Sequence, residues 1–122
     1  MLNSELEELE RQRKKRVLVD QAIAFAMQSR WEDALRANQS ILEVTPRDVD
    51  ALNRLGRALT ELGRYREARD AYNQAVKLDP LNTIAQRNLA RLSALKTDVE
   101  PPPATERVDP RLFTTEAGKS ET

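Results

Sequence analysis

The sequence predicts an all-α fold, a helical-repeat α-solenoid, and three observations support this prediction. The chain of 122 residues contains only three glycines, six prolines and few β-branched residues, a composition that favours helices. It aligns with itself at an offset of 34 residues, which is a repeat length typical of stacked helical hairpins. Within each copy, apolar and small residues recur at spacings of three and four. The length accommodates one small domain.

The 34-residue offset pairs residues of the same type at small and apolar positions and at the turns. The matched pairs are Leu18 and Leu52, Ala24 and Ala58, Ala34 and Ala68, Ala37 and Ala71, and Pro46 and Pro80. A second step of 34 takes Ala51 to Ala85 and Leu55 to Leu89 before the pattern ends. The sequence therefore predicts two full repeats, at about 15–48 and 49–82, and a closing helix over 83–96.

The second copy shows how each repeat becomes two helices. Its first helix is predicted to end at Gly63, because glycine readily adopts positive φ. Its second helix begins near Tyr65 and stops before Pro80, because the residue that precedes a proline, Asp79, is pushed out of the helical region. In the first copy Ser29 stands where Gly63 stands in the second.

The two ends of the chain differ from this repeated core at 17–96. Ser4 and Glu7 have the spacing of a capping box, so a helix is expected to start near Glu5. Residues 1–16 are predicted to form a charged helical extension, because glutamates precede arginines and lysines, as the helix dipole favours. Residues 97–122, with Pro101-Pro102-Pro103, are predicted to be an extended and then disordered tail.

One motif in the second copy resembles the tetratricopeptide repeat. The residues that carry it are Leu52-x2-Leu55-Gly56-x2-Leu59, then Ala68-x3-Tyr72-x2-Ala75 and Pro80. The resemblance covers roughly residues 17–96. Its small residues Gly56 and Ala68 would let the two helices of one repeat approach closely, and Tyr72 would fill the space beside them. The first copy departs from the family at Gln21 and Asn38, where apolar residues are usual.

The resemblance implies a protein-interaction adaptor or scaffold whose concave groove holds an extended peptide or a helix. The groove positions of the family map onto Val19, Asp20, Ile23 and Met27, onto Asn53, Arg54, Arg57 and Glu61, and onto Arg87, Asn88 and Arg91. The groove would then be apolar at its N-terminal end, at Val19, Ile23 and Met27, and rich in Arg and Asn at its C-terminal end. Arginine forks suit carboxylates, which favours a partner with an acidic end or a free C-terminal carboxylate beside an apolar anchor. Alternatively, these arginines simply occupy a solvated helix face. Val19 and Ile23 replace the Lys and Asn of the family's best-known carboxylate clamp.

The composition argues against an enzyme. The sequence contains no histidine and no cysteine, which removes imidazole catalysis, thiol catalysis and Cys/His zinc sites. Gly118-Lys119-Ser120 resembles the end of a phosphate-binding loop but lacks the upstream glycine. We therefore expect no catalytic residues, no metal and no cofactor.

A second functional hypothesis uses the N-terminal segment and the tail. Lys and Arg equal Asp and Glu at 20 each, which disfavours a globally basic nucleic-acid binder. A local cluster could still contact phosphates, or pair with the preceding glutamates; it consists of Arg11, Arg13, Lys14, Lys15 and Arg16. The chain would then be a structural or accessory subunit of a larger assembly, including one that contains nucleic acid, with Leu112-Phe113 of the tail as a further contact.

Two other features concern location and self-association. No apolar run approaches the length of about 20 residues that spans a bilayer, and the N-terminus lacks the basic and then apolar pattern of a signal peptide. We therefore expect a cytoplasmic protein with no membrane partner. Leu2, Leu6 and Leu9 form a short apolar stripe that could dock on another chain, although it is too short for a self-sufficient coiled coil. The chain could also form a homo-oligomer.

Overall fold

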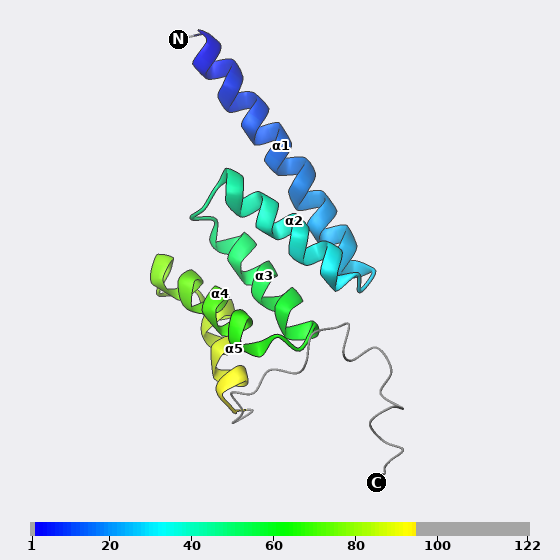
Figure 1. Cartoon of the computed structure of the whole chain (residues 1–122). Helices are drawn as coiled ribbons and strands as arrows, with labels where there is room; N and C mark the ends of the chain where they lie inside the picture. Colours follow the sequence, from blue (N-terminus) through cyan, green and yellow to red (C-terminus); the bar gives the residue numbers. More distant parts are fainter. Residues whose placement is uncertain (1, 95–122) are drawn as a thin grey trace.

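The structure, a computed structural model, describes residues 2–94 (Figure 1). In this part of the chain the elements are all helices: α1 Leu2–Met27, α2 Trp31–Val44, α3 Val49–Glu61, α4 Tyr65–Leu78 and α5 Thr83–Ala94. The predicted tail, including Leu112-Phe113, lies outside the described residues.

The helices stack in the order of the chain. The extensive contacts join α1 to α2, α2 to α3, α3 to α4 and α4 to α5, so each helix packs mainly on its neighbours in sequence. The hairpins α1–α2 and α3–α4 are the two predicted repeats, and α5 closes the array. The prediction of an all-α helical repeat is confirmed.

Both turns inside the repeats use the same hydrogen bond and a left-handed residue. The Arg30 N–H donates to the Phe25 carbonyl at 2.8 Å, and the Arg64 N–H donates to the Leu59 carbonyl at 2.8 Å. This six-to-one bond is a Schellman motif, which requires positive φ at the residue before the donor. Ser29 and Gly63 have φ of 58° and 79° respectively, so both predicted turn residues are confirmed.

The turns between repeats contain prolines that stop the preceding helices. In each turn a side chain caps the next helix. Thr45 and Asp79 precede the two prolines with ψ of 86° and 87°, outside the helical region. Asp48 Oδ1 accepts from the Ala51 N–H at 3.0 Å at the start of α3. Asn82 Oδ1 accepts from the Ala85 N–H at 2.9 Å at the start of α5, 34 residues later.

The core consists largely of alanines, because neighbouring helices lie very close together. Ala34, Ala58 and Ala68 are buried where two helices cross, and Leu52 and Leu59 fill the space around them. A second cluster joins α1 to α2 and α3 and consists of Ala22, Ala37, Ile41 and Ala51. Ala85 and Leu92 attach α5 to the main cluster.

The long first helix differs from the prediction at its start. The helix was expected to begin near Glu5, but α1 already includes Leu2 and Ser4. Ser4 therefore lies inside the first turn, where its side chain does not mark the end of the helix. The charged extension and the first helix of the first repeat form one continuous helix, whose N-terminal end projects beyond α2 (Figure 1).

Candidate functional site

A cavity of about 340 Å³ lies between the first helices of successive hairpins, α3 and α5, with one wall from α4. We call it the α3–α5 groove. Its lining residues are Asp50, Asn53, Arg54, Arg57, Tyr72, Ile84, Asn88 and Arg91. Three of these residues are cations and one is an anion, so the groove carries a positive charge and favours anionic groups.

The repeat places equivalent positions of α3 and α5 on the two sides of this groove. Asp50 and Ile84, Arg54 and Asn88, and Arg57 and Arg91 are each separated by 34 residues. The two helices start from similarly capped turns, so their equivalent residues lie in register. The walls are therefore homologous in position and different in chemistry.

Arg57 is an exposed cation of the groove. Its Nε lies 2.9 Å from Glu61 Oε2, one helical turn further on, and its guanidinium lies over the Trp31 ring at 5.1 Å from the ring centroid. Both the ion pair and the cation–π contact hold the guanidinium in place without burying it. A ligand carboxylate could reach this group without breaking the core.

Arg54 has a structural contact in addition to its place in the groove. Its Nε donates to Asn38 Oδ1 at 3.0 Å, and Asn38 Nδ2 donates to the Ala34 carbonyl at 2.9 Å. Asn38 is buried in α2, where the family usually places an apolar residue. Arg54 therefore supplies a donor to a buried amide oxygen. Without this donor the buried oxygen would destabilise the fold.

Asn53 joins the groove to the next turn. Its Nδ2 donates to Asn82 Oδ1 at 3.0 Å, and Asn82 is the residue that caps α5. Its own Oδ1 is buried and accepts no hydrogen bond from the described residues. A buried acceptor without a donor is uncommon in proteins.

On α5, Asn88 and Arg91 form a local pair. Arg91 Nη1 donates to Asn88 Oδ1 at 3.2 Å, and Asn88 Nδ2 donates to the Ile84 carbonyl at 2.8 Å. Arg91 thus has donors left for a ligand. Burial raises the pKa of Tyr72, which forms the α4 wall of the groove, although its hydrogen bond with Thr60 and the charges of Arg57 and Arg91 oppose this.

Comparison with known protein families agrees with this architecture. The tetratricopeptide repeat profile matches residues 19–83 and, in a second overlapping match, residues 55–100. Together these matches cover more than half of the chain. The chain belongs to the tetratricopeptide repeat family. This assignment confirms the resemblance found in the sequence, and tetratricopeptide repeats generally mediate interactions between proteins.

A curated relative carries the same repeat. The chain is 34% identical over 71 residues to the small glutamine-rich tetratricopeptide repeat-containing protein 2 of Mycosarcoma maydis. The match covers 58% of this chain and 20% of that protein, so it spans about a fifth of the relative's length.

Only some of the groove positions mapped from the tetratricopeptide repeat family line the α3–α5 groove. Asn53, Arg54, Arg57, Asn88 and Arg91 line the cavity together. Val19, Ile23, Met27 and Arg87 do not line it. Val19 packs partly against the smaller core cluster, whereas Ile23 and Met27 are exposed on α1. The expected apolar anchor from α1 is therefore not part of this cavity.

Sequence reasoning missed three lining residues, Asp50, Tyr72 and Ile84. Asp50 and Ile84 could have been found, because they lie one turn before Arg54 and Asn88 on the same helix faces and repeat at the same offset of 34. Tyr72 was assigned to packing alone. Ile84 is exposed and supplies an apolar surface close to the two asparagines.

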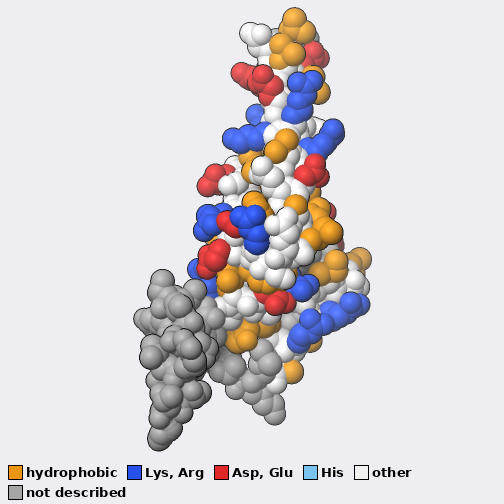
Figure 2. Space-filling model, turned by 90° about the vertical axis from the view of Figure 1, so that its right-hand side faces the viewer, with side chains coloured by type: hydrophobic (Ala, Val, Ile, Leu, Met, Phe, Trp, Pro, Cys, Tyr) orange, Lys and Arg blue, Asp and Glu red, His pale blue; other side chains and the backbone are white. Residues whose placement is uncertain are grey.

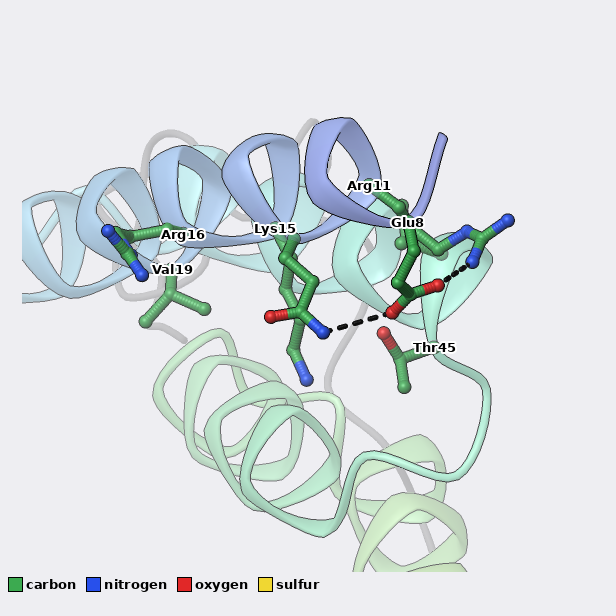
Figure 3. A pocket seen from close by; sticks show the side chains of 8 residues that line it. Glu8, Arg11, Lys15, Arg16, Val19 and Thr45 are labelled. Atoms are coloured by element: carbon green, nitrogen blue, oxygen red, sulfur yellow. Dashed lines mark hydrogen bonds and ion pairs between the residues drawn. The ribbon is translucent and has the colours of Figure 1, made fainter. Parts of the chain in front are cut away.

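A second cavity of about 630 Å³ lies under the projecting part of α1, against the end of α2 (Figure 3). Its lining residues are Glu8, Arg11, Gln12, Lys15, Arg16, Val19, Val44 and Thr45. Arg11 and Gln12 both bind the carboxylate of Glu8. Of the five cations predicted to contact phosphates, the cavity takes Arg11, Lys15 and Arg16; Arg13 and Lys14 lie elsewhere on the exposed surface of α1.

Lys15 has a structural role at this second cavity. Its Nζ lies 2.8 Å from Asp48 Oδ2, so Lys15 forms an ion pair with the residue that caps α3. Burial raises the pKa of Asp48, but the hydrogen bonds from Lys15 and from the Ala51 N–H outweigh this and hold the pKa below its usual value. Arg16 forms no ion pair with another described residue.

The described residues, 2–94, offer neither a metal site nor a membrane-spanning helix. Within this range no group of three or more carboxylate side chains is arranged to hold a metal ion. None of the five described helices combines the length and the apolar character needed to cross a bilayer.

Proposed function

We propose that the protein is an adaptor whose α3–α5 groove binds an extended peptide with a carboxylate next to an apolar side chain. The observation that carries this proposal is the cavity that brings Arg57 and Arg91 together beside the exposed Ile84. This ligand differs from the one first expected in its anchor. Ile84 of α5 takes the apolar role that the sequence assigned to α1.

Each part of such a ligand has a partner in the groove. Arg57 and Arg91 offer guanidinium donors to the carboxylate, where hydrogen bonds between charged groups are the strong ones. Asn88 offers its amide group to the peptide backbone. Ile84 offers apolar contact to the adjacent side chain.

The test compares peptides that differ only at their last group. Fluorescent peptides with one apolar residue before the C-terminus are prepared with a free carboxylate and with a C-terminal amide, and their affinities are measured by anisotropy. We expect the carboxylate series to bind and the amide series to bind at least about tenfold more weakly, because a charge-assisted hydrogen bond contributes about 1.5–3 kcal/mol. Equal affinities for both series would reject the carboxylate.

A pair of matched variants places the binding on the groove. Arg57→Ala with Arg91→Ala should remove the preference for carboxylate, whereas Arg36→Ala should keep it. Arg57 and Arg36 make a close match because each is paired with an acid on its own helix and their side chains are 61% and 64% exposed. Arg54 is left unchanged, because its loss would leave the buried Oδ1 of Asn38 without a hydrogen-bond donor. Binding that survives the double variant would place the ligand elsewhere.

A second candidate role is docking on a larger assembly through the cations of α1. The observation that favours it is Arg16, which lines the second cavity and has no ion pair among the described residues. Binding of a labelled 20-nucleotide strand should then weaken steeply with salt, and Arg13→Ala with Arg16→Ala should make the slope shallower by about two. Absence of binding at low salt would remove nucleic acid from this role.

A further inference from the structure

The side of α1 that faces away from α2 carries an apolar stripe along the projecting end of the helix. Leu2, Leu6, Leu9 and Val17 are 70%, 52%, 53% and 54% exposed. Residues of a helix are about 100° apart, which places these four on the side opposite Ala22, the residue that α1 buries against α2. Figure 2 shows this end of α1, where hydrophobic and charged side chains stand clear of the repeats. An apolar stripe of this kind on a monomer marks an interaction surface.

The charges of α1 indicate what covers the stripe. Residues 5–10 of α1 form an acidic segment and residues 11–16 form a basic segment. The acidic residues are Glu5, Glu7, Glu8 and Glu10, and the basic residues are Arg11, Arg13, Lys14, Lys15 and Arg16. An order of acid followed by base is complementary to itself when two copies run in opposite directions. We propose that two copies of this chain form a dimer through α1, antiparallel and centred near Arg11.

In this register the stripe of one copy meets the basic segment of the other. Leu9 lies beside Arg13 of the second copy and Leu6 beside Arg16 of the second copy, whose aliphatic stems cover the leucines. The guanidinium heads then lie close to Glu10 and Glu5 of the first copy. The two-fold axis doubles each contact, as it does in any isologous interface.

Other arrangements of the two helices bring like charges together. Antiparallel helices that overlap along their full length, with Leu2 opposite Met27, place Arg13 opposite Arg16. Parallel helices in register place the four glutamates of each copy side by side. Like charges at such spacing destabilise helix pairs. Of these three arrangements, the antiparallel one centred near Arg11 pairs the glutamates with the arginines. The repeats also stay apart, because the stripe and α2 lie on opposite sides of α1.

The first experiment measures the oligomeric state of the full chain by sedimentation equilibrium over a wide concentration range. We expect a dimer for the wild type and a monomer for Leu6→Lys with Leu9→Lys, with dimer affinity weakened more than about 100-fold because four leucines leave the interface and the lysines face Arg16 and Arg13 of the other copy. The matched control is Leu81→Lys, since Leu81 is also strongly exposed, at 85%, but lies in the turn before α5. This control should remain dimeric.

Far-ultraviolet circular dichroism shows whether each variant stays helical. A wild type that is monomeric at all concentrations, or a double variant as dimeric as the wild type, would overturn the proposal. So would a dimer that Leu81→Lys disrupts equally.

A charge-reversal exchange tests the pairing itself. One variant carries Glu5→Arg and Glu10→Arg, and the other carries Arg13→Glu and Arg16→Glu. Each alone should be monomeric, because residues 5 and 10 of one copy then carry the same charge as residues 16 and 13 of the other, and a mixture of the two should form heterodimers. High salt should reduce this rescue, since the charges are exposed. A mixture that stays monomeric contradicts the charge pairing.

Single cysteines fix the orientation, because the chain contains no cysteine of its own. A mixture of Leu2→Cys and Asp20→Cys chains should form a mixed disulfide under mild oxidation in the antiparallel dimer, in which residues 2 and 20 face each other. Leu2→Cys chains alone should not cross-link. The reverse result, a disulfide between two Leu2→Cys chains and none in the mixture, would show parallel helices and overturn the proposal.

Discussion

Gly56 of α3 lies directly against the ring of Tyr72 of α4. A Cβ at residue 56 would stand 2.6 Å from Tyr72 Cζ and 2.7 Å from Cε1 and Cε2, closer than atoms in contact can be. Tyr72 is 1% exposed and held by the surrounding core, so its ring cannot move away without opening the hairpin. The glycine of the repeat therefore sets the distance between its two helices.

Gly56→Ala should destabilise the protein by about 1–3 kcal/mol, although alanine is favoured over glycine inside a helix, because overpacking costs more than helix propensity returns. The β-branched Gly56→Val should cost more, since it drives the helices further apart. Urea unfolding measures both. In a Tyr72→Ala background the ring is gone, and there Gly56→Ala should be neutral or stabilising. A loss of similar size in both backgrounds would contradict the contact.

The two turns inside the repeats predict opposite effects from exchanging their residues. Ser29 and Gly63 both have positive φ, which serine adopts only at a cost. Ser29→Gly should raise the free energy of unfolding by about 1 kcal/mol, and Gly63→Ser should lower it by about the same amount. Thermal melts of both variants check this. Effects of the same sign would show that the side chains, and not the backbone conformation, decide.

The contact between Lys15 and Asp48 predicts a stability that depends on pH. Because the folded pKa of Asp48 is lowered, its contribution is present above the unfolded pKa of about 4 and is lost as pH falls through the folded value. At pH 7, Asp48→Asn removes the ion pair and keeps a capping side chain, so it should cost less than about 1 kcal/mol, since Lys15 is 36% exposed. The difference from wild type should shrink towards pH 2.

Asp48→Ala supplies the matched comparison. It also removes the acceptor for the Ala51 N–H, so it should cost about 1 kcal/mol more than Asp48→Asn, and this excess should persist at neutral pH. Unfolding by urea at several pH values separates the two contributions. If Asp48→Asn and Asp48→Ala were equally stable, the side chain would not act as a helix cap.

The hydrogen bond from Arg54 to Asn38 predicts that removing Arg54 destabilises the protein and that a second substitution, at Asn38, restores stability. Arg54→Ala should cost about 1–3 kcal/mol, because it leaves a buried amide oxygen without a donor. Asn38→Leu in the same chain should recover most of that cost, since the buried position then holds an apolar side chain. A double variant less stable than Arg54→Ala alone would show that Asn38 has another role.

Trp31 is the only tryptophan of the chain, and it reports on the groove. Its ring lies under Arg57, so a carboxylate that draws the guanidinium away should change its emission. Ligand addition should therefore shift the fluorescence of wild type and not of Arg57→Ala. Trp31 is only partly buried, so Trp31→Ala should cost less than the roughly 3–5 kcal/mol typical of a buried tryptophan.

The local devices of the fold were readable from the sequence, whereas contacts between distant residues were not. The turns were predictable from Gly63, Ser29 and Asp79, because each of these residues acts through its own backbone conformation. The 34-residue offset then relates the turns of one repeat to those of the next. Asn38 was visible only as a departure from the family, because its partner Arg54 lies on another helix. The angles between helices decide which residues share the groove. Those angles bring Ile84 into it and leave Ile23 outside, and no pattern within one helix specifies them.

The stacking of each helix on its sequence neighbours has a consequence for control. Among the described residues, the outer side of α1 and the α3–α5 groove are connected through successive helices, each packed mainly on its neighbours in sequence. Occupation of one surface therefore has little means of altering affinity at the other, and the coupling free energy between them should be close to zero. The protein would then work as a passive connector, whose two ends are loaded independently and in any order.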